Sequence, residues 1–201
     1  MIDTKTKILD AAQRLIAEHG YSGTSLRHII AEAGVNLASV HYHFGSKEEL
    51  LNALVWRKVN PVNEKRLEML DRAVAAAAPG HPPLDAVLEA FLCPMAEPAK
   101  ADPQFVKVMG RILAEGLLPQ IVEKNFSSVA ERFFGEIRRA LPGLSDEEFE
   151  WRRHFLIGAM AHTMCGHPAA TTDFETRIAY LIRFLVAGLN APALRSVEVN
   201  A

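Results

Sequence analysis

Three glycines, Gly20, Gly34 and Gly45, divide the start of the chain into short segments. Apolar residues before Gly20 recur every three or four positions, which predicts a helix over about residues 4–19. Glycine commonly follows the last turn of a helix, so the other two glycines predict two shorter helices, the second over Leu37–Tyr42. Two short helices joined by a tight turn and laid over a longer helix are helix-turn-helix geometry, which we therefore predict over about residues 25–44.

Residues that cap helix N-termini support these boundaries. Thr24 or Ser25 precedes the second helix, Asn36 precedes the third, and Ser46–Glu49 has the form of a capping box that opens a fourth. Proline lacks a backbone N–H, so Pro61 is expected to bend or interrupt that fourth helix. We therefore expect a DNA-binding domain over residues 1–60 and a helical effector-binding and dimerisation domain over residues 61–201.

The rest of the chain is also predicted to be helical. Proline-containing turns separate its segments, and no alternating strand pattern is found. Capping boxes at Ser145–Glu148 and Thr172–Glu175 predict the starts of the last two helices. The expected fold is all-α, with an N-terminal three-helix helix-turn-helix domain and a C-terminal helical domain that binds a ligand and dimerises.

Composition excludes several classes of protein. The formal net charge is −2, so any DNA-binding face must be local rather than a property of the whole surface. Two cysteines are too few for a disulfide framework, and the start of the chain lacks the apolar core of a signal peptide, which indicates a cytoplasmic protein without a membrane anchor. No catalytic motif and no Cys-x-x-Cys is present, so we expect no enzyme, no cofactor and no metal site.

The third helix divides into inward and outward side chains, as a recognition helix should. Val40 and Phe44 are expected to pack beneath it, while Arg27 and Lys47 flank it and could bind phosphates. The side chains expected to meet the groove and its edges are Leu37, Ala38, Ser39, His41, Tyr42 and His43. For each one a simpler role stays open: the histidines as ordinary surface residues, and Tyr42 as an aromatic lid on the three-helix core.

The last two helices are the predicted dimer seam. Apolar residues surround much more than one face of the first, so this helix needs partners on two sides. One partner can be its own core and the other the same surface of a second subunit, paired about a two-fold axis. The residues assigned to this interface are Trp151, Phe155, Ile178, Leu181 and Leu185. The alternative is a helix buried inside a monomer.

Soft and aromatic side chains in the second domain suggest a ligand pocket, which in proteins is mostly apolar with a few polar groups. The candidate lining residues are Phe91, Met95, Phe105, Met109, Ile112, Phe126, Phe155, Met160 and His162. Packing in an ordinary core is the simpler explanation for each of them, because methionine readily fills gaps.

Three segments, Gly20–Arg27, Ala33–Val35 and His43–Leu51, resemble the TetR family of bacterial regulators. The family usually has a tyrosine where this chain has His41. The resemblance implies an all-helical dimer whose last two helices form a four-helix interface and whose larger domain holds an effector pocket. Positions that often contact DNA in the family align with Arg27, Ser39, His41, Tyr42, His43 and Lys47.

A second similarity, to the subgroup that regulates fatty-acid and related catabolism, rests on Val35–Ser46, Asn60–Asn63 and Arg66–Asp71. Together these features predict a repressor that binds a palindromic double-stranded operator as a homodimer and is released by a small apolar or amphipathic effector. The alternative is a helical ligand-binding or protein-interaction module that does not bind DNA.

Overall fold

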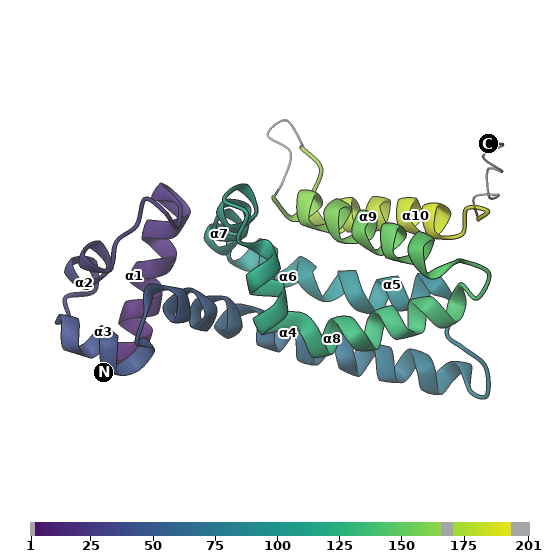
Figure 1. The fold of residues 1–201 in the computed structure, drawn as a ribbon, viewed down its shortest axis with the longest axis horizontal. Coiled ribbons are helices and arrows are strands. Elements are labelled where there is room, and N and C mark those ends of the chain that lie inside the picture. The colour runs from purple at the N-terminus through teal and green to yellow at the C-terminus, as the bar shows by residue number, and fades with distance from the viewer. Residues whose placement is uncertain (1–2, 166–170, 194–201) are drawn as a thin grey trace, which may run out of the picture. The chain divides into compact units, whose positions relative to one another are not determined.

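The structure, a computed structural model, describes residues 3–165 and 171–193 (Figure 1). Their regular structure is entirely helical, which confirms the predicted fold class. The elements are α1 (Thr4–His19), α2 (Leu26–Ala33), α3 (Leu37–Phe44), α4 (Lys47–Ala77), α5 (Leu84–Leu92), η1 (Cys93–Met95), α6 (Ala96–Ala101), α7 (Pro103–Ala114), α8 (Leu118–Ala140), α9 (Asp146–Cys165) and α10 (Phe174–Leu189). None of the helices in these ranges has the length and apolar character needed to cross a bilayer.

The chain folds into two compact units that differ from the division expected at residue 60. The N-terminal unit contains Met1–Lys65 and Pro94–Val129, and the C-terminal unit contains Arg66–Cys93 and Ala130–Ala201. Helix α4 runs uninterrupted through Pro61, although a proline there is expected to bend or interrupt it. Its neighbours Val59 and Val62 are buried, and their packing compensates for the hydrogen bond that the proline cannot donate.

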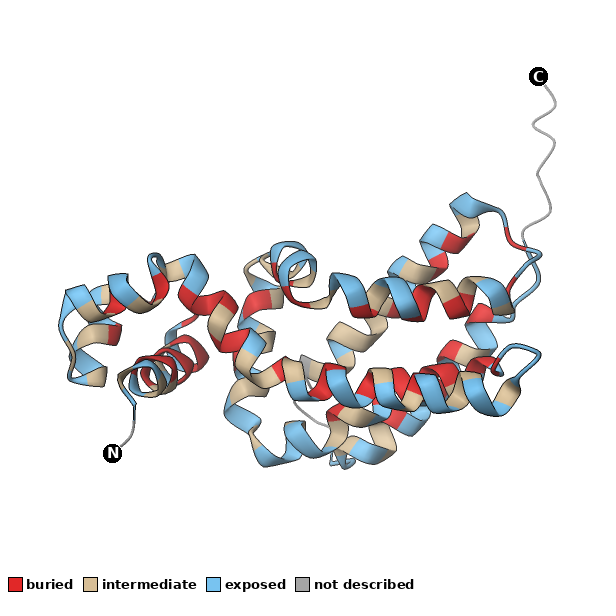
Figure 2. Ribbon diagram, turned by 90° about the horizontal axis from the view of Figure 1, so that it is seen from below, coloured by how far each residue is buried: buried red, intermediate tan, exposed pale blue. Residues whose placement is uncertain are grey.

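The core of the N-terminal unit forms around α1. The fully buried Ile8, Ala12 and Ile16 recur at intervals of four, which places them on one face of the helix (Figure 2). Val108 and Ile112 of α7 are also fully buried and belong to the same apolar cluster. The helix-turn-helix therefore shares its core with α7, a segment about ninety residues later in the sequence.

Asp102, which caps the N-terminus of α7, also binds α1 and α4. Its carboxylate accepts hydrogen bonds from Phe105 N at 3.0 Å, from Gln13 Nε2 at 2.9 and 3.0 Å, and from Lys58 Nζ at 2.6 Å. Burial alone would raise the pKa of Asp102, but these hydrogen bonds and the charge of Lys58 outweigh it and hold that pKa below its usual value.

In the C-terminal unit, α10 packs against α5 and α9. Arg152 of α9 fixes this arrangement by binding the C-terminal end of α10, where backbone carbonyls lack partners within the helix. Its side chain is nine-tenths buried, and the guanidinium also pairs with Glu148 of the preceding turn at 2.6 Å. The carbonyl oxygens that accept from it belong to Gly188 (3.4 Å), Leu189 (2.6 Å), Ala191 (2.8 Å) and Pro192 (3.2 Å).

Replacing Arg152 by methionine should lower the free energy of unfolding by about 2–3 kcal/mol, because the apolar stem stays while charge-assisted hydrogen bonds to the carbonyls at the end of α10 are lost. Thermal unfolding followed by circular dichroism measures this. Arg132→Met is the control, since it removes an exposed ion pair with Asp71 and should cost less than about 1 kcal/mol. Equal shifts for the two variants would contradict the role given to Arg152.

Candidate nucleic-acid interface

Both helices of the helix-turn-helix begin at a side-chain cap. Ser25 Oγ accepts from His28 N at 3.2 Å and opens α2, and Asn36 Oδ1 accepts from Ser39 N at 2.8 Å and opens α3. Between them Gly34 has φ 63°, a left-handed conformation that glycine adopts without strain. The tight turn predicted from the glycine and the asparagine is therefore formed as expected from these local signals.

Helix α3 has a buried face and an outward face. Val40 and Phe44 are buried in the core of the N-terminal unit. The predicted contact residues Leu37, Ala38, His41 and Tyr42 are exposed, whereas Ser39 and His43 are half-buried. A helix that anchors two apolar residues and presents its other side to solvent has the form needed to enter a major groove.

The outward side chains differ in how freely they can meet a ligand. Tyr42 is 86% exposed, and its ring meets that of His43 edge to face with ring centres 5.1 Å apart, so it is not a lid on the core. His41 Nδ1 lies 3.0 Å from the carbonyl oxygen of Gly45 and can donate to it, which leaves Nε2 for another partner. Ser39 Oγ is held by the cap, at 2.9 Å from Asn36 Oδ1.

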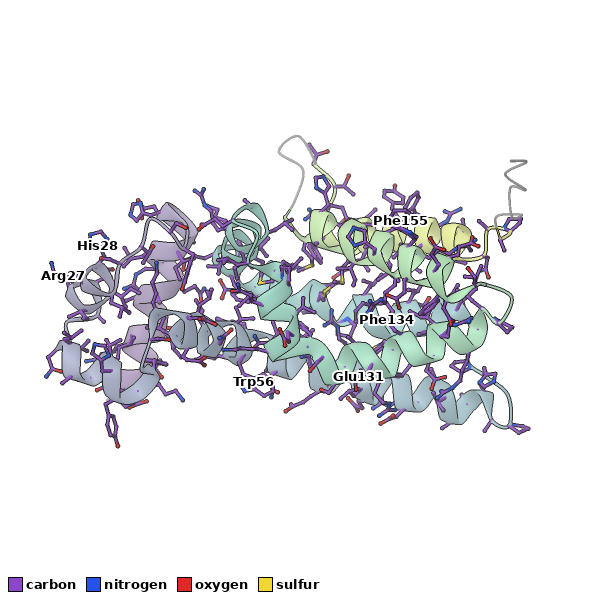
Figure 3. All side chains as sticks on the ribbon, viewed as in Figure 1. Arg27, His28, Trp56, Glu131, Phe134 and Phe155 are labelled. Atoms are coloured by element: carbon purple, nitrogen blue, oxygen red, sulfur yellow. The ribbon has the colours of Figure 1, made fainter. Side chains whose placement is uncertain are left out.

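Helix α2 presents two exposed basic side chains near its N-terminus, Arg27 and His28 (Figure 3). Sequence reasoning identified Arg27 and missed His28. The signal was available, because the two residues lie in the first turn of α2, two and three positions after the Ser25 cap, and a helix N-terminus with a cationic side chain favours a phosphate.

Lys47 lies at the start of α4 but is already engaged within the unit. Its Nζ donates to the carbonyl oxygen of Tyr21 at 2.5 Å and lies 4.0 Å from the centre of the Tyr21 ring. Partial burial lowers the pKa of Lys47, against the opposing effect of the nearby Glu115 charge. The lysine therefore holds the turn before α2 as well as flanking α3.

The predicted pocket residues divide between the two units. Met95, Phe105, Met109, Ile112 and Phe126 belong to the N-terminal unit, and Phe91, Phe155, Met160 and His162 belong to the C-terminal unit. Among the second group only Phe91 is buried, where it packs 4.9 Å from the ring of Phe133. Phe155 is 63% exposed and His162 is also exposed, so neither side chain is enclosed in the core of its unit.

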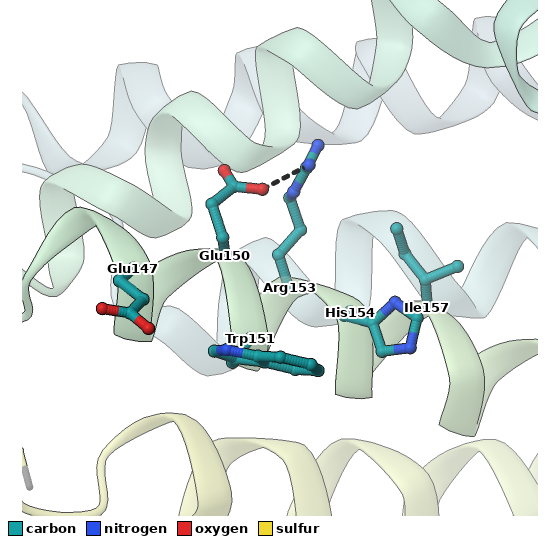
Figure 4. A pocket seen from close by; sticks show the side chains of 6 residues that line it. All are labelled: Glu147, Glu150, Trp151, Arg153, His154 and Ile157. Atoms are coloured by element: carbon teal, nitrogen blue, oxygen red, sulfur yellow. Dashed lines mark hydrogen bonds and ion pairs between the residues drawn. The ribbon is translucent and has the colours of Figure 1, made fainter.

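A surface hollow of about 440 Å³ lies on α9 and is lined by residues of that helix alone. Trp151 and His154 lie beside one another along it, with ring centres 5.9 Å apart, and Glu150 is paired with Arg153 (Figure 4). Of the predicted ligand-pocket residues, none lines this hollow. It is an exposed helix surface rather than an interior cavity.

The structure changes which residues of α10 are available to a second subunit. Ile178, Leu181 and Leu185, predicted at the interface, are buried within the single chain, because the apolar stripe of α10 faces α5 and α9. Tyr180 and Phe184, which lie off that stripe, are 62% and 68% exposed. Of the five predicted residues, Trp151 and Phe155 on α9 do remain exposed.

No cluster of three or more potential metal ligands occurs in residues 3–165 and 171–193.

Comparison with known proteins identifies both halves of the chain. Residues 8–54 match the family model described as bacterial regulatory proteins, tetR family, and residues 85–188 match the model described as tetracyclin repressor-like, C-terminal domain. A transcriptional repressor of Corynebacterium efficiens, AcnR, is 38% identical over 53 residues, and the regulator LmrA of Bacillus subtilis is 51% identical over 49. These matches span 26% and 24% of this chain and 28% and 26% of the two relatives.

The similarity of fold extends further than the similarity of sequence. The structure of the fatty acid degradation regulator FadR from Bacillus halodurans aligns with a TM-score of 0.59 over 94% of this chain and 98% of that chain, at 17% identity.

The cap of α3 can be tested separately from any DNA. Asn36→Ala should lower the free energy of unfolding by about 1 kcal/mol, because Ser39 N loses its acceptor. Asn36→Asp retains a side-chain acceptor and should lower the free energy of unfolding by only about 0.3 kcal/mol. Urea unfolding of both variants measures the difference. A loss of stability as large in the aspartate variant as in the alanine variant would show that the cap is not the cause.

Proposed function

The chain belongs to the tetracycline repressor family, and we propose that it is a DNA-binding transcriptional regulator that represses by occupying its operator. The observation that carries this proposal is the exposed outer side of α3, anchored by Val40 and Phe44. Repression is further supported by the name of the Corynebacterium relative, which is called a transcriptional repressor. A regulator of this kind acts in the cytoplasm, where its DNA lies.

Base contacts come from the outward side of α3 in this proposal. Leu37 and Ala38 offer apolar surface to thymine methyl groups, and Tyr42 and His41 offer hydrogen-bonding groups to bases or to the phosphates at the edge of the groove. Arg27 and His28 of α2 bind backbone phosphates, aided by the free N–H groups of the helix start. Lys47 adds a positive charge beside the recognition helix.

We place the homodimer seam on the exposed aromatic side chains of α9 and α10. Trp151, Phe155, Tyr180 and Phe184 are each more than half exposed, which is costly for large apolar groups in contact with water. Pairing of this surface with its own copy about a two-fold axis would bury all of them. Such a dimer presents two recognition helices to successive major grooves, and its operator is therefore palindromic.

The effector in this proposal is a small apolar or amphipathic molecule that binds within the helical body. Phe91 is the buried member of the predicted pocket residues in the C-terminal unit: its ring packs against Phe133 and Phe134, and the Arg66 guanidinium lies 4.5 Å from its centre. Burial lowers the pKa of Arg66 to about 10, so this cation remains charged at neutral pH. An effector that binds one conformation of the dimer more tightly shifts the population towards it and thereby releases the operator.

Selection from a pool of random DNA duplexes tests the proposed function and recovers the operator sequence in the same experiment. The wild-type protein should recover a palindromic sequence, and its affinity for that sequence should fall steeply as salt is raised. Recovery of no sequence, or binding equal for every duplex, would favour a helical module that does not read DNA.

Tyr42→Ala should weaken binding to the selected duplex at least about tenfold, because each of two subunits loses a contact in the groove. The fold should be unaffected, since the side chain is 86% exposed. Fluorescence anisotropy with labelled duplex gives the affinity. Trp56→Ala, a change at an aromatic residue of α4 that is also exposed, is the matched control and should bind as wild type does. Wild-type affinity of Tyr42→Ala would remove this residue from the interface.

Phe184→Ala should raise the dimer dissociation constant by on the order of 100-fold, because two phenylalanine side chains leave the symmetric seam. Sedimentation velocity over a concentration series measures it. Leu185→Ala is a poor probe, because that side chain belongs to the core. Trp56→Ala again serves as the control and should leave the constant unchanged. A dimer as tight in Phe184→Ala as in the wild type would place the seam elsewhere.

A further inference from the structure

The turn between α1 and α2 contains a carboxylate that comes from far along the chain. Glu115, which follows the last residue of α7, accepts from Tyr21 N at 2.7 Å, from Ser22 N at 2.8 Å and from Ser22 Oγ at 2.6 Å. Consecutive backbone N–H groups that point to one place form a site for an anion. Here the protein fills that site with its own side chain.

Gly20 leaves the space that this contact needs. Its φ of 78° lies in the region that favours glycine, and a β-carbon at this position would lie 2.5 Å from Glu115 Oε1. Arg111, one turn earlier on α7, donates to the carbonyl oxygen of Glu18 at 3.0 Å. The C-terminal end of α7 is therefore fastened to the end of α1 and to the turn that follows it.

The same turn is held from the other side by α4. Tyr21 donates its N–H to Glu115 and accepts from Lys47 through its carbonyl oxygen, so one residue joins α7 to the start of α4. Three residues after Ser22 the turn reaches Ser25, the cap of α2, and Lys47 follows closely on the end of α3. Through its contact with Lys47, Tyr21 thus connects the segment before the start of α2 with the segment after the end of α3.

We propose that Glu115 is a positioning residue for DNA binding: it does not touch DNA, but its carboxylate fixes the turn that sets α2 relative to the start of α4. The inference rests on the proposed function. With the other end of α7 bound to Gln13 and Lys58 through Asp102, the helix acts as a brace along α1. Loss of the Glu115 contact leaves the phosphate-binding side chains in place on α2 but changes their position relative to the DNA groove.

Glu115→Gln is the test, because it keeps the shape and removes the charge that faces two N–H groups. The probes are the duplex selected by the wild-type protein and a scrambled duplex of the same length. Affinity for the selected duplex should fall about tenfold, since hydrogen bonds to a charged group are lost. Affinity for the scrambled duplex should stay within about twofold and the salt dependence of both should be unchanged, because no phosphate contact is removed.

Two further variants separate positioning from stability. Ser22→Ala removes one donor to Glu115 and keeps the charge, so it should lower the specific affinity less, and its effect should shrink in the Glu115→Gln background. Glu123→Gln, which neutralises an exposed carboxylate of α8, is the matched control and should behave as wild type.

An unchanged ratio of specific to non-specific affinity in Glu115→Gln would overturn the proposal. A parallel loss on both duplexes, together with loss of helical circular dichroism, would also overturn it, since Glu115 would then serve only folding. If the wild-type protein selects no duplex, the proposed function itself fails. If the wild type selects a duplex and Glu115→Gln binds that duplex equally well, only the positioning role of Glu115 fails, so the two results are distinct.

Discussion

The packing of α7 on α1 is the interaction on which the N-terminal unit depends. A three-helix head of about 45 residues buries little apolar surface by itself, and domains of that size are marginal. Val108 and Ile112 enlarge its core, and Asp102 and Glu115 fix the two ends of the added helix. The position of α2 and α3 therefore depends on residues that lie outside the helix-turn-helix itself.

Local signals allowed much of the fold to be predicted. The starts of α2 and α3 each lie beside a side chain that caps them, and each of Gly20, Gly34 and Gly45 has positive φ at a helix end. These features act over three or four residues, so they can be recognised in a sequence. The candidate contact side chains on α3 followed from the same boundaries, because fixing where a helix begins also fixes which side chains face outward.

Contacts between distant segments could not be predicted in this way. Glu115 lies 93 and 94 residues from its partners Ser22 and Tyr21, and nothing in its neighbourhood marks it as different from other glutamates. The dimer interface proposed on α10 shows a different limit. Periodicity identified the stripe of Ile178, Leu181 and Leu185 correctly as apolar, but the stripe with the strongest pattern faces the core of the same chain. The exposed Tyr180 and Phe184 form a weaker sequence pattern. Their availability to a partner could be recognised only from the way α10 packs on α5 and α9.

The hydrogen bonds from Arg152 to the end of α10 also limit where the polypeptide can be shortened. Two of the four carbonyl partners of Arg152, those of Ala191 and Pro192, lie beyond the last residue of α10. A recombinant fragment trimmed at the end of that helix would leave a nine-tenths buried arginine side chain with fewer acceptors, and a charge in that position is costly to leave partly unpaired. The tail just after α10 therefore belongs to the folded body, and purification tags are better placed after Pro192 than at the helix end.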